Sequence, residues 1–233
     1  MNRLPRLMAA TKGRVTRMWK LSWLSFWTAV ALFLHGAEAQ EPHALAQSAL
    51  APPTNGIWLG AVGEGFQRGA QSFTLLFGAA AGLAAFGSDQ AHDLALASFS
   101  YGRIVGPLYG EDHWFRGNLE ARLELFGGAQ FSPGRAWLLG LTPHLRYIFA
   151  TGTRWVPFLD GGLGVSATSI GPPDLGNVFE FNLQGGGGFH WFLRDDLALT
   201  LEARYLHVSC AGISRPNQGL NSVMGMLGLT WFF

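Results

Sequence analysis

Apolar and polar side chains alternate with a period of two over most of the chain after residue 71. The alternation is clear in residues 118–125, where every second position is apolar and the positions between are polar or charged. The two sets are Leu119, Ala121, Leu123 and Leu125 against Asn118, Glu120, Arg122 and Glu124. A helical period would scatter these charges around the axis, so the pattern predicts strands with one apolar and one polar face.

The same pattern recurs in segments separated by turn-forming pieces such as Gly87-Ser88-Asp89, Ser132-Pro133-Gly134 and Gly171-Pro172-Pro173-Asp174. The predicted strands cover residues 72–86, 92–105, 115–127, 136–150, 154–168, 177–192, 196–209 and 221–233. We therefore predict an all-β fold made of eight antiparallel strands.

The long strands favour an outer-membrane barrel, whose apolar face meets lipid and whose polar face fills a narrow interior. Pairable charges share the polar face: Glu120, Arg122, Glu124, Arg146, Asp160, Glu180, Glu202 and Arg204. Aromatic residues recur near strand ends: Tyr147, Trp155, Trp191, Tyr205 and Trp231. The final strand ends on Phe233, which resembles the signal read by the barrel assembly machinery. We predict a transmembrane barrel over residues 57–233; a soluble lipocalin-like barrel is the alternative.

Eight strands close a barrel just wide enough for side chains to fill, so we expect a filled interior rather than a water-filled pore. Gly162, Gly164, Gly186 and Gly188 fall on the polar face, where they leave room for larger neighbours. We also expect His144 and His190 to join a polar interior network rather than a metal site, and Met224 and Met226 to fill gaps in the interior.

Composition and the lengths of apolar stretches further limit the classes of protein that fit this sequence. Only 13% of the 233 residues are charged, about half the roughly 25% of an ordinary soluble domain, which argues against a cytosolic enzyme. After residue 40 the sequence holds no apolar stretch of 18 or more residues, so a multi-helix membrane protein is excluded.

The first 39 residues have the pattern of a cleaved secretory signal. A basic segment, a largely apolar run over 21–34 and the small-residue site Ala37-Glu38-Ala39 follow in order. An inner-membrane anchor is the alternative, but 14 residues at about 1.5 Å each are too short for a core of about 30 Å. Residues 40–56 are predicted to be a flexible leader.

Removal of residues 1–39 changes the net charge. The mature chain would keep 10 Arg and 14 acidic residues, so its net charge is 10 − 14 = −4. A basic nucleic-acid-binding surface is thereby excluded. With Cys210 as the single cysteine, no internal disulfide can form.

Candidate catalytic residues lie at the end of the seventh predicted strand. If the alternation of this strand continues, His207 and Ser209 lie on its apolar face. The alternation of the last strand places Asn221 on the same face of the adjacent strand. Polar groups on lipid-facing positions are costly and often functional. About 12 residues separate Asn221 from Phe233, which at about 3.3 Å each and a tilt of about 40° corresponds to one hydrocarbon thickness. We therefore expect the group at the outer-leaflet interface.

The segment His207-Val208-Ser209-Cys210-Ala211-Gly212, followed by Pro216-Asn217-Gln218-Gly219 and a final strand ending in Phe, resembles the signature of the outer-membrane lipid A 3-O-deacylase (PagL), or acyloxyacyl hydrolase-like, family. The resemblance covers roughly residues 57–233. It implies an eight-stranded barrel that hydrolyses the acyl ester at position 3 of lipid A without metal or cofactor. By this resemblance, Ser209 would be the nucleophile, His207 the general base and Asn221 the residue that orients the imidazole.

Two positions depart from the family pattern. The family has an acid where this chain has Asn221, and an Asn where it has Cys210. A neutral amide cannot stabilise imidazolium by charge, so a slow enzyme is expected, and Asn221→Asp is expected to be faster. Oxyanion donors would then be the Gly212 N–H and Asn217.

Three classes of function are compatible with these observations. The preferred class is a serine esterase in the outer membrane acting on lipid A. The alternatives are a structural or interaction barrel with weakened or lost catalysis, and a soluble periplasmic barrel that binds a small hydrophobic ligand. Oligomeric state is left open between a monomer and a homodimer.

Overall fold

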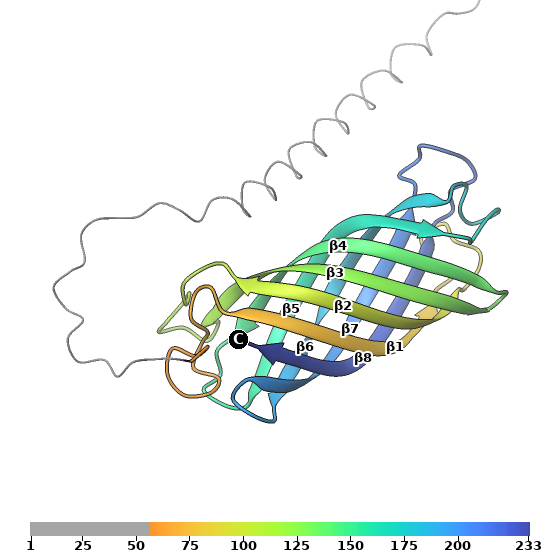
Figure 1. The fold of residues 1–233 in the computed structure, drawn as a ribbon. Helices are drawn as coiled ribbons and strands as arrows, with labels where there is room; N and C mark the ends of the chain where they lie inside the picture. The colour runs from red at the N-terminus through yellow and green to blue at the C-terminus, as the bar shows by residue number, and fades with distance from the viewer. Residues whose placement is uncertain (1–55) are drawn as a thin grey trace, which may run out of the picture. The chain divides into compact units, whose positions relative to one another are not determined.

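The computed structural model describes residues 56–233, and Figure 1 shows the long tilted strands of this part. The predicted signal over 1–39 and all but the last residue of the predicted leader over 40–56 lie outside the described residues. The strands are β1 (Gln71–Gly82), β2 (Asp93–Ile104), β3 (Gly117–Ser132), β4 (Ala136–Phe149), β5 (Trp155–Thr168), β6 (Phe179–Phe192), β7 (Leu197–Ser209) and β8 (Leu220–Phe232).

The eight strands of the described part form one closed antiparallel barrel in sequence order. Closure comes from β8, which pairs with β1 from Ser72↔Phe232 to Gly82↔Ser222. Both the start of β1 and the chain's C-terminus therefore lie at one end, and the β7–β8 connection lies at the other (Figure 1). The predicted fold class is confirmed.

Burial follows the predicted period of two. In β2, buried and exposed positions alternate from Leu94 to Ile104, and the other strands repeat this for most of their length. Large apolar side chains on the outer face stay about half exposed, for example Leu123 at 48%, Leu139 at 49% and Leu227 at 49%. An exterior this apolar suits lipid rather than water. Within residues 56–233 no helix is long and apolar enough to cross a membrane.

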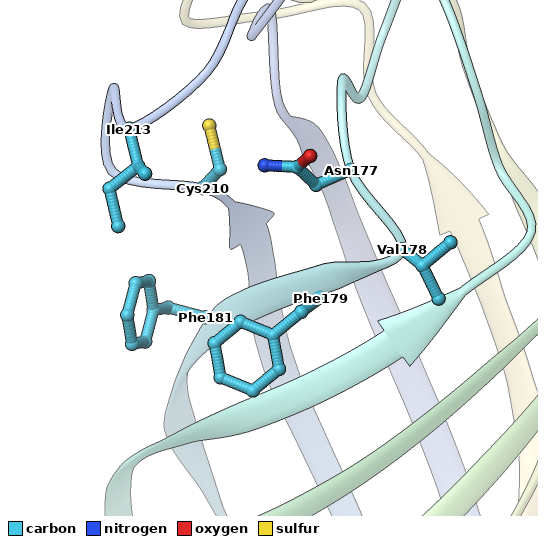
Figure 2. Close-up of a pocket in the computed structure, with 6 residues that line it drawn as sticks. All are labelled: Asn177, Val178, Phe179, Phe181, Cys210 and Ile213. Carbon is cyan, nitrogen blue, oxygen red and sulfur yellow. The ribbon is translucent and has the colours of Figure 1, made fainter.

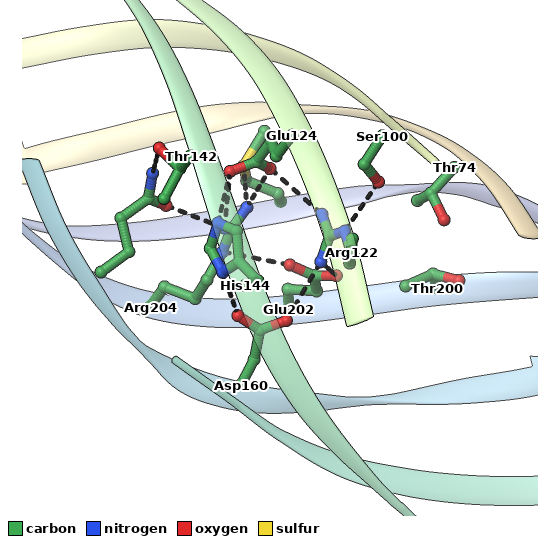
Figure 3. Close-up of polar contacts among 12 residues, drawn as sticks. Thr74, Ser100, Arg122, Glu124, Thr142, His144, Asp160, Thr200, Glu202 and Arg204 are labelled. Atoms are coloured by element: carbon green, nitrogen blue, oxygen red, sulfur yellow. Dashed lines mark hydrogen bonds and ion pairs between the residues drawn. The ribbon is translucent and has the colours of Figure 1, made fainter. Parts of the chain in front are cut away.

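Charged side chains fill the middle of the barrel, as the alternation of polar and apolar positions predicts. Figure 3 shows Arg122 of β3 and Arg204 of β7 among carboxylates from β3, β5 and β7. Arg122 lies 3.1 Å from Asp160, and Arg204 lies 2.7 Å from Glu124, while Arg146 pairs with Glu202. These side chains are at most 1% exposed, so each charge depends on its partners for the interactions that water would otherwise supply.

Two interior glycines make the room that the sequence predicts. A Cβ on Gly162 would meet the ring of His144, and a Cβ on Gly188 would meet the ring of Phe158. Met224 and Met226 are each 3% exposed and pack in the interior apolar cluster nearer the β7–β8 connection. Small residues thus alternate with large ones across the barrel.

Aromatic side chains fill the barrel at the end where the C-terminus lies, and this feature was not predicted. Trp58 and Phe66, which precede β1, stack at 4.2 Å between ring centroids. Phe66 also stacks on Phe232 at 4.9 Å, and the Trp58 indole N–H donates to the carbonyl of Asp195 at 2.8 Å. The segment before β1 therefore fills this end of the interior.

Two predicted strand ends were wrong. The first strand ends at Gly82, whose pairing with Ser222 is the last of its register with β8, and the chain turns beyond it at Phe86 and Gly87, which have positive φ values of 56° and 99°. The third strand continues to Ser132 rather than ending at 127, since Gly127 and Gly128 still pair with Leu139 and Leu138. Glycines lack the side chains that would have marked the alternation.

Candidate active site

The candidate catalytic residues lie where β7 and β8 meet, at the end away from the C-terminus. The register pairs His207 with Asn221, and Ser209 is the last residue of β7. Leu206 and Val208, the neighbours of His207, are fully buried in the interior. His207 and Ser209 therefore project outward, as their phase predicts, and are half-buried.

The imidazole of His207 joins the other two side chains. Its Nε2 lies 3.0 Å from the Ser209 hydroxyl, and its Nδ1 lies 2.8 Å from Oδ1 of Asn221. Since a carbonyl oxygen can only accept, Nδ1 must carry the proton. Nε2 is then free to accept the proton of the Ser209 hydroxyl, which is the arrangement a general base needs.

Two further groups form hydrogen bonds with the Asn221 side chain, and the sequence did not predict a role for either of them. The hydroxyl of Tyr205 donates to Asn221 Oδ1 at 2.5 Å, and Asn221 Nδ2 donates to the Ala85 carbonyl at 2.8 Å. Tyr205 shares the outward phase of His207, so its proximity had a signal in the sequence. The Ala85 carbonyl had none, because any residue presents the same backbone group.

The residues predicted to form an oxyanion site lie in the loop that follows Ser209. There the N–H of Cys210 donates to Oδ1 of Asn217 at 3.0 Å, and Gly212 donates its backbone N–H to the Cys210 sulfur. The Gly212 N–H is thus engaged within the loop and would have to exchange its present hydrogen bond to reach a substrate oxygen. Asn217 uses only its oxygen in its contact with Cys210, so its Nδ2 would have to be turned toward the substrate.

Cys210 organises this loop. Burial raises the pKa of the Cys210 thiol, but hydrogen bonds from the Ser214 hydroxyl and backbone lower it by more, so that its pKa lies below the ordinary value. The sulfur lies 3.5 Å from both the nitrogen and the hydroxyl of Ser214. Ala211 and Gly212 have positive φ values of 52° and 78°, which turn the chain back immediately after Cys210.

An apolar cavity of about 450 Å³ opens beside the serine. It is lined by Asn177, Val178, Phe179, Phe181, Cys210 and Ile213 (Figure 2). Phe181 is the β6 partner of Ser209 in the sheet and Cys210 follows Ser209 in the chain, so two residues that line the cavity are neighbours of the serine. Val178, Phe179 and Ile213 are largely exposed, so the cavity is continuous with the apolar exterior.

The other candidates belong to the interior. His144 lies 2.5 Å from Asp160 and 3.1 Å from Glu124 through its two ring nitrogens, and His190 lies 2.8 Å from Thr200. The predicted polar network is confirmed for both histidines. Among residues 56–233 no group of three or more His, Cys, Asp or Glu side chains is placed to hold a metal ion.

A closed antiparallel barrel with an apolar exterior and a charged interior defines a β-barrel of the outer-membrane class, here with a Ser–His pair on its outer face. The model of one family, lipid A 3-O-deacylase (PagL), matches residues 98–230. The chain belongs to this family.

Two relatives carry the same name, lipid A deacylase PagL. The protein of Bordetella bronchiseptica is 35% identical over 95 residues, which cover 40% of this chain and 49% of the relative. That of Pseudomonas aeruginosa is 33% identical over 87 residues, covering 36% and 47%. The chain thus spans about half the length of the curated relatives it matches.

Solved structures show the same fold. The crystal structure of the outer membrane enzyme PagL superposes with a TM-score of 0.50 at 19% identity, covering 68% of this chain and 97% of that one. Neisserial surface protein A gives a TM-score of 0.51 at 16% identity, with coverage of 70% and 97%. At these identities the likeness concerns the fold alone.

Proposed function

We propose that this protein is an outer-membrane serine esterase that hydrolyses the acyl chain ester-linked at the 3-O position of lipid A. The observation that carries the proposal is the contact chain from Ser209 through His207 to Asn221, on the lipid-facing side of the barrel. Membership of the lipid A 3-O-deacylase family supports the reaction and the substrate.

In the first half-reaction the Ser209 oxygen attacks the ester carbonyl while His207 Nε2 takes the hydroxyl proton. The imidazolium keeps its Nδ1–H on Asn221 Oδ1. Collapse of the tetrahedral intermediate breaks the bond to the sugar oxygen, which takes the proton back from Nε2. An acyl group remains on Ser209.

In the second half-reaction water replaces the sugar. His207 takes a proton from the water, whose oxygen attacks the acyl carbonyl, and Ser209 leaves with that proton. The released acyl chain is a free carboxylic acid. Oxyanion stabilisation would come from the loop after Ser209, once the Gly212 N–H exchanges its contact with the Cys210 sulfur for one with the substrate, or the Asn217 Nδ2 turns to donate to it.

The cavity beside Ser209 suits an acyl chain. Its apolar lining includes Phe179, Phe181 and Ile213, and it opens on the same face that would meet the outer leaflet. A chain seated there would have its ester carbonyl near the Ser209 hydroxyl. The apolar lining therefore supports a lipid ester rather than a water-soluble one.

The location follows from the same proposal. Residues 1–39 would direct export and be cleaved, and residues 40–56 would link the cleavage site to the barrel over 57–233. The assembly machinery would then insert the barrel by its C-terminal strand ending in Phe233. The active end would face the outer leaflet, where lipopolysaccharide resides.

Mass spectrometry of lipid A after incubation with the refolded protein tests the proposal. Wild type is expected to release one acyl chain, and Ser209→Ala to release none while remaining folded. Ser222→Ala is the matched control, because Ser222 lies on the neighbouring strand but faces the interior. Intact lipid A with folded wild type would contradict the esterase and favour the second candidate, a barrel of this family without catalysis.

A further inference from the structure

Asn221 is fixed by three hydrogen bonds that leave its amide one orientation. Oδ1 faces two donors, the His207 ring and the Tyr205 hydroxyl, at 2.8 Å and 2.5 Å. Nδ2 faces the Ala85 carbonyl oxygen at 2.8 Å. Since a backbone carbonyl can only accept, the nitrogen must point to Ala85 and the oxygen to His207.

The Ala85 contact comes from the β1–β2 connection, which docks on the start of β8 through its backbone. The N–H of Leu83 donates to the Asn221 carbonyl at 2.7 Å. The chain turns directly after Ala85, where Phe86 has a φ of 56°, and the Phe86 ring meets Tyr205 edge-on at 6.3 Å. Asn221 is only 1% exposed, so these partners replace water around it.

We propose that Tyr205 is a positioning residue for His207, acting through Asn221, and that the Ala85 carbonyl adapts the site to an amide at position 221. This inference deepens the proposed function and rests on it for its kinetic consequences. Tyr205 and Ala85 hold the Asn221 oxygen against Nδ1, and that contact selects the tautomer in which Nε2 can accept the Ser209 proton.

The geometry also changes the expectation for an acid at position 221. In Asn221→Asp, the second carboxylate oxygen would face the Ala85 carbonyl across the 2.8 Å that Nδ2 now bridges as a donor. Two acceptors at that distance repel each other, so the carboxylate must shift or lose its alignment with His207. We therefore expect Asn221→Asp to have a kcat no higher than wild type, against the simple expectation from the sequence.

The test uses two measurements on the refolded protein in detergent. Nitrogen-15 NMR of labelled histidine reports which ring nitrogen of His207 is protonated, with His207→Gln for assignment. Lipid A hydrolysis reports kcat and KM. Tyr205→Phe removes only the hydroxyl, and Tyr101→Phe is the matched control, since Tyr101 is an outward strand tyrosine that donates to Gln71 at 2.6 Å.

We expect the Nδ1–H tautomer in wild type and in Tyr101→Phe, and a mixture of both tautomers in Tyr205→Phe. The kcat of Tyr205→Phe should fall by about tenfold with KM unchanged, as for the loss of one hydrogen bond to the orienting group. A purely structural role for Tyr205 would lower the unfolding temperature without changing the tautomer.

The inference is overturned if the His207 tautomer in Tyr205→Phe equals that in wild type, or if Asn221→Asp is faster than wild type. A wild type that hydrolyses no lipid A would contradict the proposed function, yet the tautomer comparison would still decide the role of Tyr205. The two failures are therefore distinguishable.

Discussion

Two histidines in this barrel have opposite surroundings. His144, in the interior, has a carboxylate on each ring nitrogen, Asp160 at 2.5 Å and Glu124 at 3.1 Å. His207, on the outer face, has an amide oxygen on one nitrogen and a hydroxyl on the other. Both ring nitrogens of His144 are thus engaged by carboxylates, so neither is free for a substrate. The neutral setting of His207 leaves a nitrogen able to act as a base.

The same contrast extends to the neighbouring groups. The charged interior side chains labelled in Figure 3 pair with one another and are at most 1% exposed. Ser209, by comparison, is half-buried, and its β6 partner Phe181 lines an apolar cavity. The interior cluster therefore satisfies its charges within the barrel, whereas the outer group lies on the apolar face that we propose meets lipid.

The largest effect is expected when Ser209, the proposed nucleophile on the outer face, is replaced. Ser209→Ala should lower the rate of ester hydrolysis by at least about 10³-fold, because within residues 56–233 no other hydroxyl contacts His207 Nε2. Folding should be unchanged, since the lost hydroxyl is half-buried at a strand end. Hydrolysis rates and heat-modifiable gel mobility check the two statements, and an equal loss of folded barrel would contradict them.

The interior is expected to respond in the opposite way. Glu124→Gln removes a carboxylate that pairs with Arg204 at 2.7 Å and with Arg122 at 3.1 Å. Breaking a buried ion pair from one side costs about 3–5 kcal/mol in the free energy of unfolding. Urea unfolding in detergent measures this loss. The rate of ester hydrolysis per folded molecule should stay near wild type, and a selective loss of activity would contradict the division between the two regions.

The cavity should affect binding rather than chemistry. Phe179→Ala is expected to raise KM for lipid A several-fold, up to about tenfold, by removing apolar contact with the acyl chain, and to leave kcat nearly unchanged. Phe99→Ala is the matched control, since Phe99 is a similarly exposed aromatic of β2. Equal KM values for the two variants would show that the cavity is not the acyl site.

The smallest effect concerns Cys210. Because hydrogen bonds from Ser214 lower the pKa of the thiol, the thiolate should form at a lower pH than in an ordinary cysteine. The rate of alkylation by a small maleimide, followed by intact mass against pH, should rise with a midpoint below the usual thiol range. Ser214→Ala should move the midpoint upward, and an unchanged midpoint would contradict the assigned cause.

The sequence predicted the barrel because its period of two persists wherever side chains are present to show it. It also predicted that His207, Ser209 and Asn221 meet, since phase and register place them on one face. It could not predict the Ala85 contact, which joins residues 136 positions apart through a backbone atom. The aromatic filling by Trp58 and Phe66 was missed because residues 57–70 lack a strand period.

The most direct test of the central claim is covalent labelling of the folded protein by an alkyl fluorophosphonate, followed by intact mass and peptide mapping. An activated serine should give one adduct on Ser209 in wild type and none in Ser209→Ala. In His207→Ala the reaction should be slower by about 100-fold or more, as expected for loss of a general base. An unlabelled wild type, or labelling that is unaffected by His207→Ala, would contradict the claim that the outward histidine activates this serine.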